Sequence, residues 1–275
     1  MLLFAAAATI AVAISLHAPL PLVNFGFVLL AFGYLAILER IIPYNTAWFP
    51  EAWEWRRDGL YYVMTMVSGG VARAAVISAG TLAAPLRTNL PLWVEIPAAM
   101  LVVSLCSYTY HRLSHRIPWL WKLHGVHHAP LKVNVSNNSV NQFLDVIFHL
   151  LATQLPVFLL GFSQPAVFAA MMFKAAQGYG VHANIDVKLG WLNYLIVTQE
   201  QHRLHHSTDP RESGHYAADF AIWDLLFGSF TWTPRRVPAQ VGLQDPAAFP
   251  SVRSVLANQA HPFRRSGYLQ RSAAR

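Results

Sequence analysis

Long apolar stretches dominate the chain, and short polar or proline-containing segments separate them. They run at about residues 2–16, 22–42, 60–84, 91–110, 143–161 and 163–181. A helix needs roughly 20 apolar residues to cross the hydrocarbon core of a bilayer, and the stretches 22–42 and 91–110 meet that length directly. The pattern predicts an all-α integral membrane protein with about six helical spans that form a membrane base.

The first stretch is shorter and ends at His17-Ala18-Pro19. A cleaved signal peptide is an alternative for this segment, because a signal peptide also contains an apolar run. However, no basic segment precedes the run, and a second apolar stretch follows almost at once. We therefore expect a retained first helix.

Composition supports a membrane protein. Of the 275 residues, 55% are hydrophobic and 12% are charged, about half the roughly 25% charged residues of soluble domains. The single cysteine, Cys106, excludes a disulfide framework, a four-cysteine zinc site and a cysteine-ligated iron–sulfur cluster.

The net charge of +7 comes mostly from the C-terminal end. Residues 234–275 contain seven arginines and one acid, Asp245, so this segment alone carries +6. The rest of the chain is too apolar for nucleic-acid binding and carries no nucleic-acid-binding motif. We expect a single membrane-embedded domain over residues 1–233, followed by a basic cytoplasmic tail over 234–275.

Basic residues also gather on one side of the predicted membrane base. The connections after the second, fourth and sixth stretches carry nine arginines and lysines between Arg40 and Arg203, whereas the opposite side carries only Arg87. Cytoplasmic loops are enriched in Lys and Arg. The asymmetry predicts that both termini face the cytoplasm, together with a helical cap that holds the histidine-rich segments.

Eight of the 13 histidines fall into three clusters with helical spacing. They are His111 and His115; His124, His127 and His128; and His202, His205 and His206. Residues three or four apart lie on one helical face, and imidazole is the commonest metal ligand. Because a catalytic zinc site needs only three protein ligands, eight histidines suit two metal ions. A site rich in histidine nitrogens fits iron, copper or zinc.

The remaining histidines differ in their positions. His182 directly follows the last apolar stretch and is the predicted ninth ligand, while His215 lies near the third cluster but outside its spacing. We interpret His149, inside an apolar run, as a packing or hydrogen-bonding residue. His17 lies on the far side of the membrane in this topology, and His261 lies in the tail.

Three acids near the clusters are candidates to orient the ligands, namely Asp145, Glu200 and Asp224. Ligating histidines usually donate their second ring N–H to a carboxylate or a carbonyl. One alternative function is a zinc-dependent membrane hydrolase, but a His-Glu-x-x-His motif does not occur in the sequence. Another is a metal-binding or metal-transport membrane protein, which would place its ionisable ligands inside the spans.

Three histidine-containing words resemble the histidine boxes of the fatty acid hydroxylase/sterol desaturase superfamily. They are His111-Arg-Leu-Ser-His115, His124-Gly-Val-His-His128 and His202-Arg-Leu-His-His206. Leu120-Trp121 and Trp223-Asp224 also look like the residues that flank these boxes in that superfamily. The resemblance covers roughly residues 100–230 and is strongest to the bacterial sterol desaturase members.

The resemblance implies a non-haem diiron oxygenase that uses O₂ to hydroxylate, or alternatively to desaturate, an unactivated C–H bond. The implied substrate is a membrane lipid such as a sterol or a fatty acyl chain. The implied cofactors are two iron ions, with electrons from an external ferredoxin or cytochrome b5 and its reductase. The implied location is the bacterial inner membrane. Many members carry Asn-Tyr-Gly where this chain has His215-Tyr216-Ala217, so His215 is the candidate for a tenth ligand.

Overall fold

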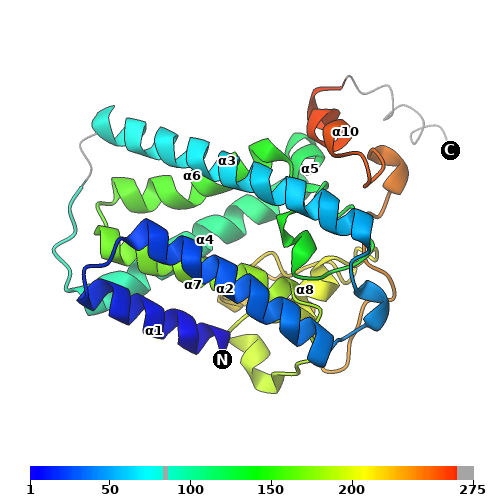
Figure 1. Cartoon of the computed structure of the whole chain (residues 1–275), viewed down its shortest axis with the longest axis horizontal. Coiled ribbons are helices and arrows are strands. Elements are labelled where there is room, and N and C mark those ends of the chain that lie inside the picture. Colours follow the sequence, from blue (N-terminus) through cyan, green and yellow to red (C-terminus); the bar gives the residue numbers. More distant parts are fainter. Residues whose placement is uncertain (83–85, 265–275) are drawn as a thin grey trace.

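The computed structural model describes residues 1–82 and 86–264 (Figure 1). The described residues form helices joined by loops and contain only isolated β-bridges, not strands. The α-helices are α1 (Leu2–Ser15), α2 (Leu20–Ile41), α3 (Ala52–Leu82), α4 (Leu92–Arg116), α5 (Pro118–His124), α6 (Phe143–Leu159), α7 (Gln164–His182), α8 (Gln199–His205), α9 (Ile222–Leu226) and α10 (Val255–Ala260). The short 3₁₀ helices are η1 (Thr46–Trp48), η2 (Ser136–Ser139), η3 (Gly190–Tyr194), η4 (Pro246–Ala248) and η5 (His261–Phe263).

Each of the six long helices contains most of one of the six apolar stretches of the sequence, and residues 83–84 of the third stretch lie outside the described residues. Three of them, over Leu20–Ile41, Ala52–Ala79 and Leu92–Arg116, are long and apolar enough to cross a membrane. Helices α1 and α6 are apolar but shorter, with 14 and 17 residues. The protein is therefore an all-α membrane protein with three candidate spans among its described residues.

Helix α3 begins at Ala52, eight residues before the predicted apolar stretch. The cause lies in its first turn, where Glu54 accepts a hydrogen bond of 2.8 Å from the backbone N–H of Glu51. A side-chain acceptor at a helix N-terminus satisfies a backbone donor that has no partner within the helix. The polar segment before the apolar stretch thus continues the same helix into the cap.

Helix α4 lies at the centre of the bundle and packs against α6 and α7. Small residues line the contact, where Ala99, Ala166 and Ala170 are at most 1% exposed. Small side chains let helices in a membrane approach closely. Large apolar residues such as Leu30 and Val67 point outward from the bundle, as expected for a surface that contacts lipid.

The cap gathers at one end of the long helices, where α5, α8 and α10 lie (Figure 1). Part of the predicted basic tail belongs to this cap: Val241 forms a β-bridge with Ser207, and the Phe249 ring lies 5.9 Å from that of Trp121. The remainder of the predicted tail, residues 265–275, lies outside the described residues. The described part of the segment 234–275 therefore folds against the histidine-rich region.

Candidate metal centre

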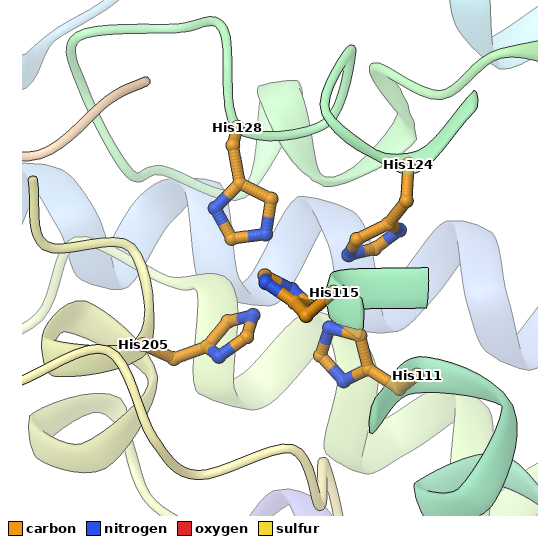
Figure 2. A group of neighbouring side chains, drawn as sticks. All are labelled: His111, His115, His124, His128 and His205. Carbon is orange, nitrogen blue, oxygen red and sulfur yellow. The ribbon is translucent and has the colours of Figure 1, made fainter. Parts of the chain in front are cut away.

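Nine histidines form two clusters at the junction of the helical bundle and the cap. The first cluster is shown in Figure 2, and its ligand nitrogens lie within 4.8 Å of one another. The imidazole ring centroids of His111 and His205 are 4.5 Å apart, and those of His111 and His124 are 4.6 Å apart. Its members are His111 and His115 of α4, His124 of α5, His128 of the following turn and His205 of α8.

The second cluster lies beside the first and contains four histidines. Its members are His127, His182, His202 and His206, again with ligand nitrogens within 4.8 Å. The rings of His128 and His206, one from each cluster, stack with centroids 4.4 Å apart. The structure thus brings together all nine histidines that the sequence singled out as ligands.

Hydrogen bonds to one ring nitrogen fix how the first-cluster imidazoles face each other. The Nδ1–H groups of His111 and His205 donate to the carbonyl oxygens of Tyr216 (2.6 Å) and Gly214 (2.8 Å), and that of His124 donates to Asp145 (3.0 Å). A neutral imidazole that donates through Nδ1 keeps its lone pair on Nε2. The Nε2 atoms of these three histidines are buried and have no hydrogen-bond partner.

Two histidines of the second cluster follow the same rule, whereas the Nε2 atoms of His202 and His206 lie 3.2 Å apart and share a hydrogen bond. His182 donates through Nδ1 to the carbonyl of Asn134 at 2.8 Å, and His127 donates to the carbonyl of Val140 at 3.3 Å. The Nε2 atom of His182 is buried without a partner. Buried polar atoms are nearly always hydrogen-bonded, so a group of inward-facing bare nitrogens fits metal ligation.

The electrostatics of the cap keep its histidines neutral. Burial, followed by the neighbouring imidazoles, holds the pKa values of His127, His128, His202 and His206 well below their usual range. Burial also lowers the pKa of His205 to about 3. Only a neutral imidazole can ligate a metal through its lone pair, and these side chains are in that form at neutral pH.

The three candidate orienting acids have different positions. Asp145 contacts a cluster residue directly, since its Oδ2 accepts from His124 Nδ1 at 3.0 Å, while its Oδ1 accepts from the hydroxyl of Tyr110 at 2.6 Å. Asp224 does not contact a cluster histidine. It accepts hydrogen bonds from the backbone N–H groups of Tyr216 and Ala217, and the carbonyl of Tyr216 accepts from His111. Glu200 instead accepts a hydrogen bond from Asn193, away from both clusters.

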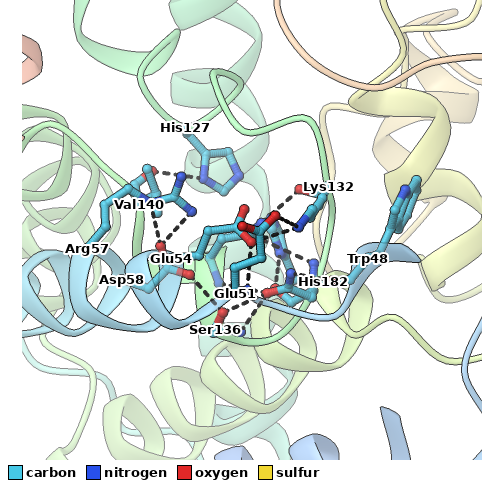
Figure 3. Close-up of polar contacts among 12 residues, drawn as sticks. Trp48, Glu51, Glu54, Arg57, Asp58, His127, Lys132, Ser136, Val140 and His182 are labelled. Carbon is cyan, nitrogen blue, oxygen red and sulfur yellow. Dashed lines mark hydrogen bonds and ion pairs between the residues drawn. The ribbon is translucent and has the colours of Figure 1, made fainter. Parts of the chain in front are cut away.

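The loop around η2 supports the second cluster from the bundle side (Figure 3). Ser136 donates to Asp58 of α3 at 2.7 Å, and Lys132 forms an ion pair of 2.7 Å with Glu54. These contacts place the Asn134 and Val140 carbonyls that accept from the cluster. The polar first turns of α3 therefore hold a part of the site.

Glu39 is a site-supporting residue that sequence reasoning did not find. This acid of α2 is 4% exposed, and one of its oxygens accepts from the backbone N–H groups of Val135 and Asn184, both at 2.7 Å. Those segments carry the Asn134 carbonyl and follow His182. The sequence did offer a signal, because Glu39 lies near the end of a long apolar stretch. A carboxylate in that position is energetically costly unless other groups pair with it.

The histidines outside the clusters have other partners. The Nε2 atom of His215 accepts from the backbone N–H of Thr231 at 3.0 Å, so His215 belongs to neither cluster. Its role as a tenth ligand is not supported by this geometry. His149 forms a hydrogen bond of 2.9 Å with Ser107 and stacks on Tyr110, as a packing and hydrogen-bonding residue would. His261 packs against Phe249.

Comparisons with known proteins agree on one group of enzymes. The fatty acid hydroxylase family matches residues 96–229. The ornithine lipid hydroxylase OlsE of Rhizobium tropici is 29% identical over 248 residues, which cover 85% of this chain and 73% of that protein. The alkylglycerol monooxygenase of Danio rerio is 32% identical over 139 residues, which cover 48% of this chain and 29% of that protein. No solved structure matches the chain.

Proposed function

This chain belongs to the fatty acid hydroxylase/sterol desaturase superfamily, and on that premise we propose that its two histidine clusters hold two iron ions. The protein is a membrane-bound lipid hydroxylase, an oxidoreductase of the monooxygenase type. The observation that carries the proposed iron centre is the set of nine histidines in two adjacent groups, seven of which have a buried ring nitrogen without a hydrogen-bond partner. His111, His115, His124, His128 and His205 would hold one ion, and His127, His182, His202 and His206 would hold the other.

Bound iron would supply, with O₂, the oxidising power that breaks an unactivated C–H bond. The protein's own part is to fix the ligands before the metal binds. The hydrogen bonds from His111, His124 and His205 hold the three rings with Nε2 toward the centre. Because these partners are mostly backbone carbonyls of a packed cap, the ligand geometry is preorganised.

A groove between α2 and α3 is the proposed route of the lipid chain. It has a volume of about 520 Å³ and is lined by Leu29 and Phe32 of α2 and by Trp55 and Tyr62 of α3. Both helices are candidate membrane spans. The groove also reaches Ser136, in the loop that supports the second cluster. An acyl chain lying there would extend from the bilayer toward the histidines.

The membrane topology and the electron supply complete the proposal. Six helices would cross or enter the bilayer of a bacterial inner membrane, with both termini and the histidine cap on the cytoplasmic side, as the basic connections indicate. Each hydroxylation consumes two electrons from outside. We propose that a ferredoxin or cytochrome b5 system docks on the cytoplasmic face, and that the +6 charge of residues 234–275 steers an acidic donor.

The test combines metal analysis with product analysis. Protein purified anaerobically should contain about two iron ions per chain, the number that the two clusters would hold. Ornithine lipids and alkylglycerols are the first substrates to assay, because the relatives are named for them. Hydroxylation adds one oxygen atom to the lipid mass, and desaturation removes two hydrogens. One tightly bound zinc ion and no iron after reconstitution would contradict the proposal and favour a zinc-dependent hydrolase.

A further inference from the structure

A second cavity, lined mostly by charged residues, lies beside α8. Its empty volume, which includes space open to solvent, is about 550 Å³. Arg203, which lines it, is the residue after His202, so one short helix faces both the cluster and the cavity. The charged lining residues are Asp186, Lys188, Glu200, Arg203, Arg235 and Arg236.

Arg203 is the central feature of this cavity. It is 3% exposed, and its guanidinium lies 3.8 Å from the centre of the Tyr44 ring. Its Nη1 donates a hydrogen bond of 3.3 Å to the carbonyl oxygen of Ile185. A guanidinium has five N–H donors, and burying a cation is costly unless it is paired. Within residues 1–82 and 86–264, no carboxylate lies within 4.0 Å of it.

The other charges of the lining give the cavity both signs. Arg236 already pairs with Glu212 at 3.6 Å, outside the cavity lining. Lys188 and Arg235 form no ion pair with any other described residue. Four cations and two carboxylates line one cavity, which suits a ligand with an anionic group beside a cationic one better than it suits a purely acidic surface.

The position of the cavity indicates the depth of lipid headgroups. Tyr44 lies three residues after the end of α2, a candidate membrane span. Near Lys188, the side chains of Trp191 and Tyr194 are 69% and 47% exposed. Tryptophan and tyrosine are enriched where a membrane meets water. The cavity therefore lies where the polar end of a membrane lipid would be found.

We propose that this cavity binds the zwitterionic headgroup of the lipid substrate, with the anionic phosphate or carboxylate on Arg203 and the ammonium between Asp186 and Glu200. This inference rests on the proposed function, because it assumes that a membrane lipid is the substrate. It names the headgroup class that the enzyme selects. Since α8 carries the cluster residues His202 and His205 and is followed directly by His206, headgroup binding would also fix the lipid relative to the reaction centre.

Binding can be measured without turnover, on the purified full chain in detergent by titration calorimetry. The probes are short-chain phosphatidylethanolamine, which is zwitterionic, short-chain phosphatidylglycerol, which is only anionic, and inorganic phosphate. We expect phosphatidylethanolamine to bind most tightly. Arg203→Gln should weaken this binding about 30-fold or more, because it removes one partner of a buried charge pair. Lys188→Gln, at the exposed wall, should weaken it about threefold.

Arg211→Gln is the matched control, since Arg211 is exposed, pairs with Asp209 and does not line the cavity. It should bind like the wild type. If Arg203→Gln does not fold, the Lys188→Gln result decides. Equal affinity for phosphate and lipid would indicate a site for free anions, and tighter binding of phosphatidylglycerol would exclude the zwitterionic headgroup. Either result would overturn the proposal.

Two further results separate this inference from its alternatives. If Lys188→Gln raises the electron-donor concentration needed for half-maximal turnover while lipid binding is unchanged, the cavity is a docking site for an acidic protein and the proposal is wrong. Headgroup binding that persists in protein containing zinc and no iron would leave the cavity assignment standing while the proposed oxygenase function fails.

Discussion

Filling the groove between α2 and α3 would test whether the lipid chain reaches the histidine clusters by that route. Gly59 of α3 lines the groove, and a Cβ atom added there meets no atom within 4 Å. The Cβ of Gly59→Leu therefore meets no neighbour, and the rest of its side chain would occupy space in the groove. Because glycine in a helix is destabilising by about 0.5–1 kcal/mol relative to alanine, α3 should be at least as stable in the variant.

The expected loss is one of positioning rather than of hydrophobic binding. An acyl chain leaves apolar bilayer to enter an apolar groove, so its transfer contributes little binding free energy. A displacement of about 1 Å at the reacting carbon can cost about 100-fold in rate, which corresponds to about 2.7 kcal/mol of activation free energy. We therefore expect kcat/KM to fall about 10- to 100-fold, with iron content unchanged.

Gly70→Leu provides a matched control on the same helix. Gly70 is also free of neighbours within 4 Å and does not line the groove. It lies eleven residues further along α3, about three turns and roughly 16 Å away, on nearly the same face. The assay is lipid hydroxylation in nanodiscs with a fixed donor system. Wild-type kcat/KM in Gly59→Leu, or an equal loss in Gly70→Leu, would refute the route.

Four further predictions concern the proposed iron centre and its surroundings. Asp145→Asn, which removes the carboxylate that faces His124, should weaken iron binding about 10- to 100-fold in chelator competition; unchanged affinity would show that Asp145 is not needed to orient the ligand. His205→Ala should abolish turnover with the protein still in the membrane, whereas His261→Ala should not, and full activity of His205→Ala would be incompatible with the first cluster as a metal site. Burial lowers the pKa values of His205 and His215 to about 3, so below pH 6.5 the unfolded chain binds more protons than the folded protein. The unfolding free energy of metal-free protein should therefore fall as the pH decreases from 6.5 toward 3, by up to about 1.4 kcal/mol per pH unit for each histidine. A thermal midpoint that increases when the pH is lowered from 7.5 to 5.5 would contradict this. Turnover with an acidic donor should decrease as salt shortens the Debye length, about 10 Å at 0.1 M, and deletion of residues 250–275 should remove that dependence if the tail steers the donor.

Sequence reasoning could locate the helices because apolar length is a strong one-dimensional signal. It also found eight of the nine clustered histidines, since residues spaced three or four apart are visible along the chain, and it selected His182 from its position directly after the last apolar stretch. It could not find Glu39, because the value of a buried acid depends on the two backbone N–H groups that reach it from residues 135 and 184. Glu200 was selected for its closeness in sequence to His202, but its side chain points toward Asn193.

The division of the histidines between the clusters follows from the geometry of the HxxHH word. In the second box, His124 and His128 join the first cluster and His127 joins the second. In the third box, His202 and His206 join the second cluster and His205 joins the first. The histidines four apart share a face, whereas adjacent residues on a helix differ by about 100°.

The adjacent histidines join different clusters although their rings are close, with centroids 5.5 Å apart both for His127 and His128 and for His205 and His206. Each HxxHH word therefore supplies two nitrogens to one cluster and one to its neighbour, and the two words do so in opposite senses. Such a motif contributes histidines to both clusters and so fixes the distance between them. A single HxxxH pair, such as His111 and His115, serves only one cluster. The repeated motif thus fits the proposed pair of metal ions, but which histidine goes to which cluster depends on how α5 and α8 face each other across the cap.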